Sequence, residues 1–351
     1  MDKRVMSLGL FAAAIACGGG PGDGGTSDAN SVTDGAYQGR CTLDAMSATN
    51  TELVTREASD GIADNIAVDA SYVYWQDYSE WLGEPDLLRV PRTGGDPELL
   101  AHLDEGGQSV VGADNVYIRT DSEIVTVPKA GGQPVPFAKL ESGAWGGGRI
   151  AQDDEHVYAM DEDSWCEGQG AIYAFDKQTG EKGVVAKDLV CPAVLALDTD
   201  HAYFVEQVGS DESDLALMRV PLAGGTPELL ARAPVNLGPG IAPGGSYVYF
   251  VESDGLEGFL FRVPKTGGSI EQVLPCGQII TVMRSGEEGV YFANSDVVSG
   301  NNGNSFSLIP SDGSSPRFEP APDNEFAGDF VVDGTTVYQA SVEGVWAITH
   351  P

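Results

Sequence analysis

Short runs of alternating apolar and polar residues follow one another along most of the chain, and turns that contain Gly, Asp or Pro separate them. The apolar positions are rich in Val, Ile, Leu and Tyr, and their spacing of two residues is typical of β-strands that bury one face. The apolar period of a helix does not stand out in any stretch. The pattern therefore predicts an all-β protein.

One unit of this pattern occurs seven times. Its clearest feature is a strand with a tyrosine at a fixed place, and these tyrosines are Tyr74, Tyr117, Tyr158, Tyr203, Tyr249, Tyr291 and Tyr338. Successive tyrosines are roughly 45 residues apart, which is the length of one four-stranded propeller blade. Each unit contains an apolar strand, the Tyr strand, a third strand and, after a Gly-rich turn, a fourth strand. We therefore predict a seven-bladed β-propeller with four-stranded antiparallel blades.

The turn before the fourth strand repeats closely, as VPRTGG from Val90, VPKAGG from Val127, VPLAGG from Val220 and VPKTGG from Val263. Paired glycines suit a hairpin turn, because glycine adopts positive φ without steric cost. A phosphate-binding loop would need Gly-Lys-Ser/Thr in front of a helix. The paired glycines are therefore predicted to be structural.

The seventh unit ends after its third strand, and a matching fourth strand occurs near the other end of the chain. Residues 50–57, NTELVTRE, resemble the fourth strands of other units, such as PELLA in the first unit. We predict that Glu52 to Glu57 completes the last blade, because closing the ring in this way removes exposed sheet edges.

Tyr74, Trp75, Gln76 and Asp77 resemble the Tyr-Trp-Thr-Asp motif of YWTD propellers, and the strands IAVD and LALD are similar to the first blade strands of YWTD and NHL propellers. The resemblance covers residues 50–350 as a blade pattern. Trp follows the repeat tyrosine only in the first unit, and YWTD propellers have six blades, whereas seven units are present here. The resemblance implies an extracellular type of propeller and indicates no ligand.

The first residues have the pattern of an export signal. Lys3 and Arg4 precede an apolar run over residues 5–16, which is shorter than the roughly 20 residues that a membrane-spanning helix needs. The small residues before Cys17 resemble a bacterial lipobox, in which that cysteine is lipidated; the alternative is an ordinary secretory signal. We expect a signal peptide over residues 1–16, a lipidated Cys17 with a flexible tether over residues 17–49, and the propeller over residues 50–351.

This N-terminus predicts a lipoprotein of the bacterial cell envelope that is extracytoplasmic, resides at the outer membrane and contacts the membrane through its lipid alone. The composition of 19 Lys+Arg and 53 Asp+Glu gives a formal net charge of −34. Such a surface repels nucleic acid, so a nucleic-acid partner is excluded. The acidity suits either solubility or the binding of a cation or a basic partner. We expect a monomer.

Four cysteines remain beside Cys17, and an even number indicates disulfides in an exported protein. Cys166 follows the second strand of the third unit, and Cys191 is at the entry to the fourth unit. These two kinds of connection emerge on the same face of a propeller, so we predict the pair Cys166–Cys191. The pair Cys41–Cys276 follows only by elimination.

Long acidic loops join the second and third strands in four units, and these loops and the blade-entry loops beside them carry large aromatic residues. Loops of this kind commonly bind partners. The ligand-binding candidates are Tyr78, Trp81, Trp145, Asp163, Trp165 and Phe326. The alternative is that each aromatic side chain packs on its own loop. Asp161 and Asp163 begin a calcium-loop pattern that Cys166 and Glu167 interrupt, and they are the candidates for a calcium site.

The sequence lacks the motifs H-E-x-x-H, G-x-S-x-G and G-x-x-x-x-G-K. His156 and His201 occupy the same place in their units, which indicates a repeat position rather than catalysis. We expect a non-enzymatic binding or scaffold lipoprotein that holds a protein or glycan ligand on the acidic, aromatic loop face, with no cofactor apart from the calcium candidate. The alternative is an extracytoplasmic hydrolase or lyase at the mouth of the central channel, because propeller enzymes gather residues from several blades.

Overall fold

The computed structural model describes residues 44–45, 49–55, 62–78, 84–141, 149–161, 169–209, 215–232, 237–253, 258–274, 279–295, 304–312, 314, 317–320, 327–341 and 344–349. The regular elements in these ranges are β-strands. Within the same ranges, no helix has the length and apolar character needed to cross a membrane.

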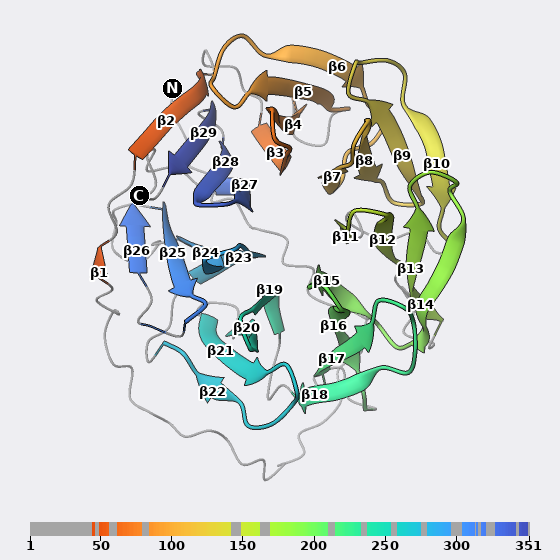
Figure 1. Ribbon diagram of the computed structural model, residues 1–351, viewed down its shortest axis with the longest axis vertical. Coiled ribbons are helices and arrows are strands. Elements are labelled where there is room, and N and C mark those ends of the chain that lie inside the picture. The colour runs from red at the N-terminus through yellow and green to blue at the C-terminus, as the bar shows by residue number, and fades with distance from the viewer. Residues whose placement is uncertain are drawn as a thin grey trace, which may run out of the picture.

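The described strands form seven sheets around a central axis, each built on four antiparallel strands (Figure 1), which confirms the predicted propeller. Blade 1 contains β3 (Ile62–Val68), β4 (Tyr72–Tyr78), β5 (Asp86–Pro91) and β6 (Glu98–His102). Blade 2 contains β7 (Ser109–Val111), β8 (Asn115–Arg119), β9 (Glu123–Pro128) and β10 (Val135–Lys139). Blade 3 contains β11 (Ile150–Gln152), β12 (His156–Asp161), β13 (Gly170–Asp176) and β14 (Lys182–Leu189). Blade 4 contains β15 (Ala193–Leu197), β16 (His201–Gln207), β17 (Leu215–Pro221) and β18 (Glu228–Arg232).

The remaining three blades follow the same order. Blade 5 contains β19 (Leu237–Gly244), β20 (Tyr247–Ser253), β21 (Gly258–Pro264) and β22 (Glu271–Gln272). Blade 6 contains β23 (Ile279–Ser285), β24 (Gly289–Ser295), β25 (Asn304–Pro310) and β26 (Arg317–Pro320). Blade 7 contains β27 (Ala327–Asp333), β28 (Thr336–Ser341), β29 (Gly344–Thr349) and, as its outer strand, β2 (Thr49–Thr55).

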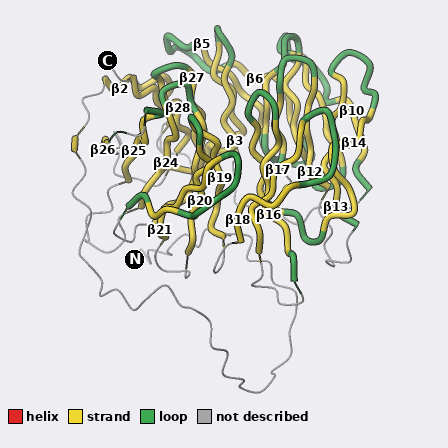
Figure 2. Tube along the Cα trace, turned by 60° about the horizontal axis from the view of Figure 1, so that its bottom comes forward, coloured by secondary structure: helices red, strands yellow, loops and turns green. Residues whose placement is uncertain are grey.

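The first strand of each blade lies next to the axis and the fourth lies at the rim (Figure 1). The strands run between two ends of the ring, where the connections lie (Figure 2). We call one end the turn face; it carries the turns between first and second strands and between third and fourth strands. The other end, the loop face, carries the connections between second and third strands and from one blade to the next.

Buried apolar side chains fill the spaces between neighbouring blades. Leu53 and Tyr338 of blade 7 pack in one cluster with Trp75 of blade 1, and Tyr203 of blade 4 packs with Ile241 of blade 5. Corresponding clusters of described residues lie between the other neighbouring blades. Both faces of each Tyr strand are therefore buried, which explains why these strands carry apolar residues at successive positions.

The start of the described chain closes the ring, as predicted. β2 pairs antiparallel with β29, with Glu52 opposite Trp346. The strand begins at Thr49, earlier than the predicted Glu52, and residues 56–57 lie outside the described ranges. In addition, β1 (Asp44–Ala45) pairs parallel with β26. The end of the segment expected to be a tether therefore lies along the outer strand of blade 6.

The paired glycines of the turn face are structural, as predicted, and they also join blades. Gly131 has a φ of 82°, and its N–H donates to Pro128 O at 2.8 Å, which closes the turn. The next residue, Gly132, donates to Leu100 O in the outer strand of blade 1 at 3.0 Å. Gly225 makes the same contact with Val185 O of the preceding blade at 3.2 Å. Gly95 donates in the same way to Leu53 O at 3.4 Å, so these three turns are docked on the neighbouring blade.

Candidate functional site at the mouth of the central channel

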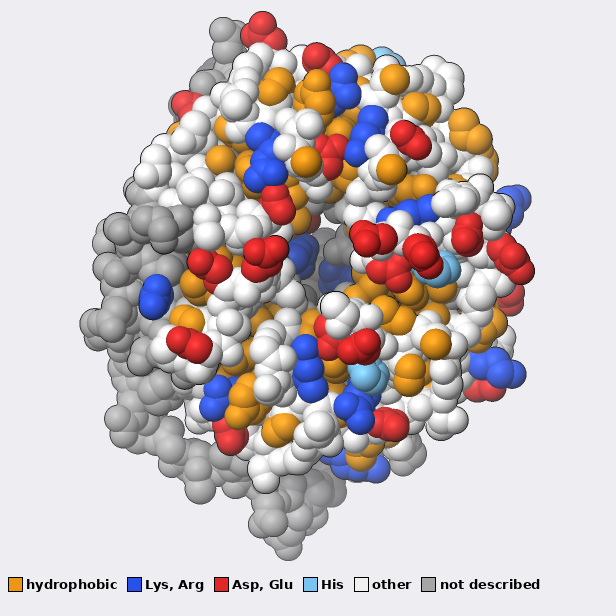
Figure 3. Space-filling model, viewed as in Figure 1, with side chains coloured by type: hydrophobic (Ala, Val, Ile, Leu, Met, Phe, Trp, Pro, Cys, Tyr) orange, Lys and Arg blue, Asp and Glu red, His pale blue; other side chains and the backbone are white. Residues whose placement is uncertain are grey.

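An opening lies at the centre of the ring, and side-chain atoms of Lys or Arg are visible inside it (Figure 3). The inner strands begin at the loop face, and their first residues differ around the ring. Nine positions before the repeat tyrosine, blades 7, 1, 2 and 3 carry polar residues, which are Asp329, Asn65, Gln108 and Arg149. Blades 4, 5 and 6 carry Val194, Gly240 and Val282 at the same position. The polar residues therefore occupy one side of the channel mouth.

Bulges occur in the inner strands of blades 7 and 1, as they do in those of blades 4, 5 and 6. The pairing of β3 with β4 shifts between Asp64 and Ala67, and Asn65 within the bulge has a φ of 51°. The pairing of β27 with β28 shifts between Ala327 and Asp329. A bulge turns side chains away from the regular alternation of a strand, and bulges are frequent beside functional sites. Asn tolerates the left-handed backbone region better than most residues.

Three neighbouring blades contribute charged groups at this place. Arg284 of β23 contacts Asp329 of β27, with Nη2 2.6 Å from Oδ1, and its Nη1 donates to Met283 O at 3.0 Å. Asp64 of β3 lies close enough to Asp329 and Arg284 for both charges to affect its titration. We call Asp64, Asn65, Tyr78, Arg284 and Asp329 the channel-mouth cluster.

A chain of hydrogen bonds fixes the Asn65 and Tyr78 side chains of the cluster. Asn65 Nδ2 donates to the Tyr78 hydroxyl at 3.3 Å, and that hydroxyl donates to Gln76 Oε1 at 3.2 Å. Gln76 is fully buried; its Nε2 donates to Gly107 O at 2.5 Å, and its Oε1 accepts the Gly107 N–H at 3.0 Å. The Asn65 amide is thereby held by a network that is itself fastened to blade 2.

The Asp64 carboxyl resists ionisation. Burial raises its pKa and the nearby Asp329 charge raises it further, to about 6, although the Asn65 N–H and the Arg284 charge act in the opposite direction. Burial together with the Asp64 charge also raises the pKa of Tyr78 to about 12, so this hydroxyl keeps its proton at neutral pH. Asp64 therefore titrates near the pH range in which binding and catalytic carboxyls change charge.

Two other loop-face carboxyls share this behaviour. Glu206 is at the loop-face end of β16, and Glu252 has the corresponding place on β20. Burial raises the pKa of each, and for Glu206 a hydrogen bond from the Val190 N–H at 3.1 Å offsets part of the effect. For both carboxyls, the effect of burial on the pKa is larger than the effect of any hydrogen bond that they accept.

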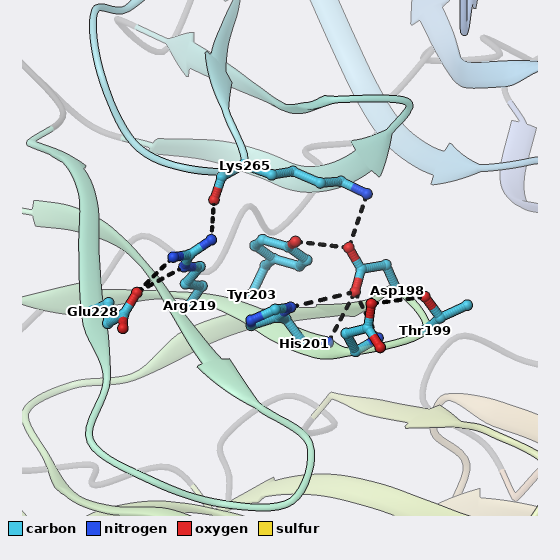
Figure 4. Close-up of polar contacts among 8 residues, drawn as sticks. Asp198, Thr199, His201, Tyr203, Arg219, Glu228 and Lys265 are labelled. Carbon is cyan, nitrogen blue, oxygen red and sulfur yellow. Dashed lines mark hydrogen bonds and ion pairs between the residues drawn. The ribbon is translucent and has the colours of Figure 1, made fainter.

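Aspartates of the turn face are different, as Asp198 shows (Figure 4). Its carboxylate accepts the N–H groups of Asp200 at 3.0 Å and His201 at 2.8 Å, and the Tyr203 hydroxyl at 2.7 Å. Lys265 of the next blade adds its Nζ at 2.8 Å. Burial alone would raise the pKa of Asp198, but these four donors outweigh it and lower the pKa to about 2.

The same arrangement occurs in other blades. Asp69 accepts four donors, including Lys129 Nζ at 2.6 Å, and its pKa is likewise lowered to about 2 against the effect of burial. Asp153 accepts the Tyr158 hydroxyl at 2.7 Å and two N–H groups. Arg92 Nη1 lies 2.6 Å from Asp333 Oδ2 of blade 7. These turn-face cations are therefore engaged with carboxylates of neighbouring blades.

No protein-family model and no curated protein sequence matches the chain. Solved structures of β-propellers are similar to it. A catalytically inactive virginiamycin B lyase from Staphylococcus aureus, bound to quinupristin, is similar at 14% identity with a TM-score of 0.59, covering 87% of this chain and 100% of that one. An oligogalacturonate lyase in complex with manganese is similar at 12% identity with a TM-score of 0.59, covering 88% and 95%. BamB from Moraxella catarrhalis is similar at 14% identity with a TM-score of 0.51, covering 89% and 98%. At these identities the likeness shows the fold alone.

The sequence-predicted site residues are placed only in part. Tyr78 belongs to the channel-mouth cluster. The other ligand-binding candidates lie outside the described residues, and they are Trp81, Trp145, Asp163, Trp165 and Phe326. Asp161 is buried at the end of β12 and accepts the Glu141 N–H at 2.8 Å. Within the described ranges, His, Cys, Asp and Glu form no group of three that could hold a metal. The calcium site stays a prediction.

The cysteine predictions also stay open. Cys191 is 7% exposed at the entry to blade 4 and takes part in a disulfide. Cys166, its predicted partner, lies outside the described residues, as do Cys17, Cys41 and Cys276. Neither predicted pairing is tested by the described part of the chain.

Sequence reasoning missed four members of the cluster, which are Asp64, Asn65, Arg284 and Asp329. A signal was present, because each is a polar or charged residue in a first blade strand, where apolar or small residues prevail. Aligning the first strands of all units would have singled out these positions.

Proposed function

We propose that this chain is a non-enzymatic binding or scaffold lipoprotein of the bacterial cell envelope, tethered through Cys17, that holds its partner on the loop face. One observation carries the proposal: the turn-face carboxylates of Asp69 and Asp198 are saturated with donors, whereas three loop-face carboxyls are not. Asp198 and Asp69 have lowered pKa values, and Asp64, Glu206 and Glu252 have raised ones. Polar groups held at a cost to stability are typical of interaction sites.

The direction in which the chain enters the ring supports this orientation. Fourth strands run from the turn face to the loop face, and β2 serves as the fourth strand of blade 7. β1 runs parallel to β26, the fourth strand of blade 6, so it has the same direction. A tether attached before β1 therefore joins the propeller on its turn-face side. The loop face is the end of the propeller farther from this attachment.

Site-specific photocrosslinking in native cells tests the proposal. A benzophenone amino acid replaces either Glu105, which is exposed on the loop face between β6 and β7, or Ala223, which is exposed in a turn of the turn face. We expect partner adducts from position 105 and none from position 223. A Cys17→Ser variant should leave the membrane fraction. Equal adducts from both faces, or none from either, would contradict a loop-face binding role.

The channel-mouth cluster also supports the alternative function, a lyase or hydrolase. Asp64, with its raised pKa, could accept a proton from a substrate, and Arg284 could stabilise a developing negative charge. Two of the similar structures are lyases. Incubation with oligogalacturonates and with quinupristin, followed by mass spectrometry, separates the two functions. Product formation that Asp64→Asn abolishes would favour the enzyme.

A further inference from the structure

The number of hydrogen-bond donors separates the turn-face carboxylates of Asp69 and Asp198 from that of Asp64. Asp69 and Asp198 accept four hydrogen bonds each, counting those from lysine. Among the residues that the structure describes, Asp64 accepts one, from the Asn65 N–H at 2.8 Å. An ionised carboxylate has about four acceptor sites. Asp64 is therefore equipped to accept donors that the described chain does not supply.

Arg284 does not fill this role, because it is committed to Asp329. Its Nη2 is 2.6 Å from Asp329 Oδ1, and Asp329 Oδ1 also accepts the Phe330 N–H at 2.8 Å. The charges of Arg284 and Asp329 compensate each other, and Asp64 contributes one further negative charge. The charged or titratable groups that face Asp64 are Asp329, Arg284 and Tyr78, and none of them adds a free positive charge.

Resting on the proposed loop-face function, we propose that Asp64 receives one cationic group, an ammonium or a guanidinium, of a ligand that enters the channel mouth from the loop face. Such a group supplies several N–H donors and one positive charge, which are what Asp64 lacks. The Asn65 N–H, which lies within the bulge of β3, holds the Asp64 carboxylate in place for this contact. The formal net charge of −34 favours the approach of cations to the molecule as a whole.

When the cation binds, a protonated Asp64 carboxyl releases its proton to the solvent, because binding favours the ionised carboxylate. Burial and the Asp329 charge raise the pKa of Asp64, so at mildly acidic pH much of the free protein carries the protonated form. Affinity should therefore fall as pH decreases. Between pH 7 and pH 5 the expected loss is about tenfold, since only about a tenth of a group is ionised one unit below its pKa.

Isothermal titration calorimetry with small cationic probes tests the proposal. Cadaverine provides ammonium groups and agmatine adds a guanidinium; a blocked peptide with one lysine shows whether a side chain in a polypeptide binds as a free amine does. Pentanediol and glutarate are the neutral and anionic controls. We expect the cations to bind at pH 7, to release a proton near pH 5.5 and to bind about tenfold more weakly at pH 5.

The matched variants are Asp64→Asn and Asp153→Asn, which remove the same charge at the channel mouth and on the turn face. We expect Asp64→Asn to weaken cadaverine binding about tenfold or more and to abolish proton release. Asp153→Asn should bind as the unchanged protein does. Thermal melting shows that both variants are folded.

The proposal is overturned if neither cation binds at millimolar concentration, if Asp64→Asn binds them as well as the unchanged protein does, or if glutarate binds in their place. The photocrosslinking result is independent of these outcomes. Adducts from position 105 without cation binding would leave the loop-face function standing and reject the cationic ligand. Cation binding without adducts would support the cationic ligand and reject a macromolecular partner on the loop face.

Discussion

Two turn glycines have nearly the same backbone but different surroundings. Gly245 and Gly334 each precede the repeat tyrosine by four residues, and their φ values are 54° and 59°. A Cβ at Gly245 would lie 2.8 Å from Ser311 O of the next blade, whereas a Cβ at Gly334 would meet nothing within 4 Å. Positive φ is needed at both places, and close approach between blades is an additional requirement only at Gly245.

We expect Gly334→Ala to lower the free energy of unfolding by about 1 kcal/mol, which is the cost of placing Ala at positive φ. Gly245→Ala should cost about 2–3 kcal/mol, because backbone of blade 6 must also shift. Urea unfolding of both variants measures the difference. Equal losses would show that the Ser311 contact imposes no constraint.

At the level of elements, the turn between first and second strands joins each blade to the next in one of two ways. An aspartate five residues before the repeat tyrosine occurs in blades 1, 3, 4 and 7, and glycine occupies that position in blades 2, 5 and 6. Lys129 bonds the aspartate of blade 1, and Lys265 bonds that of blade 4. Blade 4 itself carries Leu222 at the position of the lysine, so among the described residues no lysine of the next blade bonds Asp153 of blade 3. Asp153 is therefore an internal control for the ion pair between Asp198 and Lys265.

We expect Asp198→Asn to lower the free energy of unfolding at pH 7 by about 2 kcal/mol and Asp153→Asn by about 1 kcal/mol. The pKa of folded Asp198 lies below its unfolded value, so its contribution is complete above about pH 4 and is lost as the pH falls toward 2. Unfolding measured between pH 2 and pH 7 should show the gap between Asp198→Asn and the unchanged protein closing at low pH. A gap that persists at pH 2 would exclude the ion pair as its source.

On the scale of the whole molecule, one short strand at the chain start completes the ring. Leu53 and Val54 of β2 are 4% and 9% exposed, and they pack in the cluster between blades 7 and 1. The burial of these two side chains and the pairing of β2 with β29 hold the first and last described segments of the propeller together. Without β2, β29 would present an unpaired edge, which favours association between molecules.

Truncation tests this closure. A chain that starts after Thr55 should lose about 3–5 kcal/mol of unfolding free energy and should associate, because two buried side chains and the outer strand are removed. A chain that starts after Ser47 lacks β1 but keeps β2, and it should remain monomeric with nearly unchanged stability. Urea unfolding and size-exclusion chromatography give the result. A stable monomer after the longer truncation would show that closure contributes little.

The sequence by itself determined the repeat and therefore the fold. The seven tyrosine strands, the paired glycines and the fourth-strand pattern near residue 52 each reflect local requirements for strand burial, turn backbone and sheet pairing, and these are expressed within a few residues. Such signals survive in sequence because each is read over a short stretch. Tyr78 was selected as an aromatic residue of an acidic loop, and the structure places it at the end of β4.

Only the tertiary structure decided which of the polar residues in the first strands meet at the channel mouth. Asp64, Arg284 and Asp329 are brought together because the first and last blades become neighbours when the ring closes, and bulges lie beside Asp64 and Asp329. The difference between Asp64 and Asp198 is likewise invisible in sequence. Donor number and burial depend on groups from other blades, and these set the pKa of a carboxyl more strongly than its neighbours along the chain do.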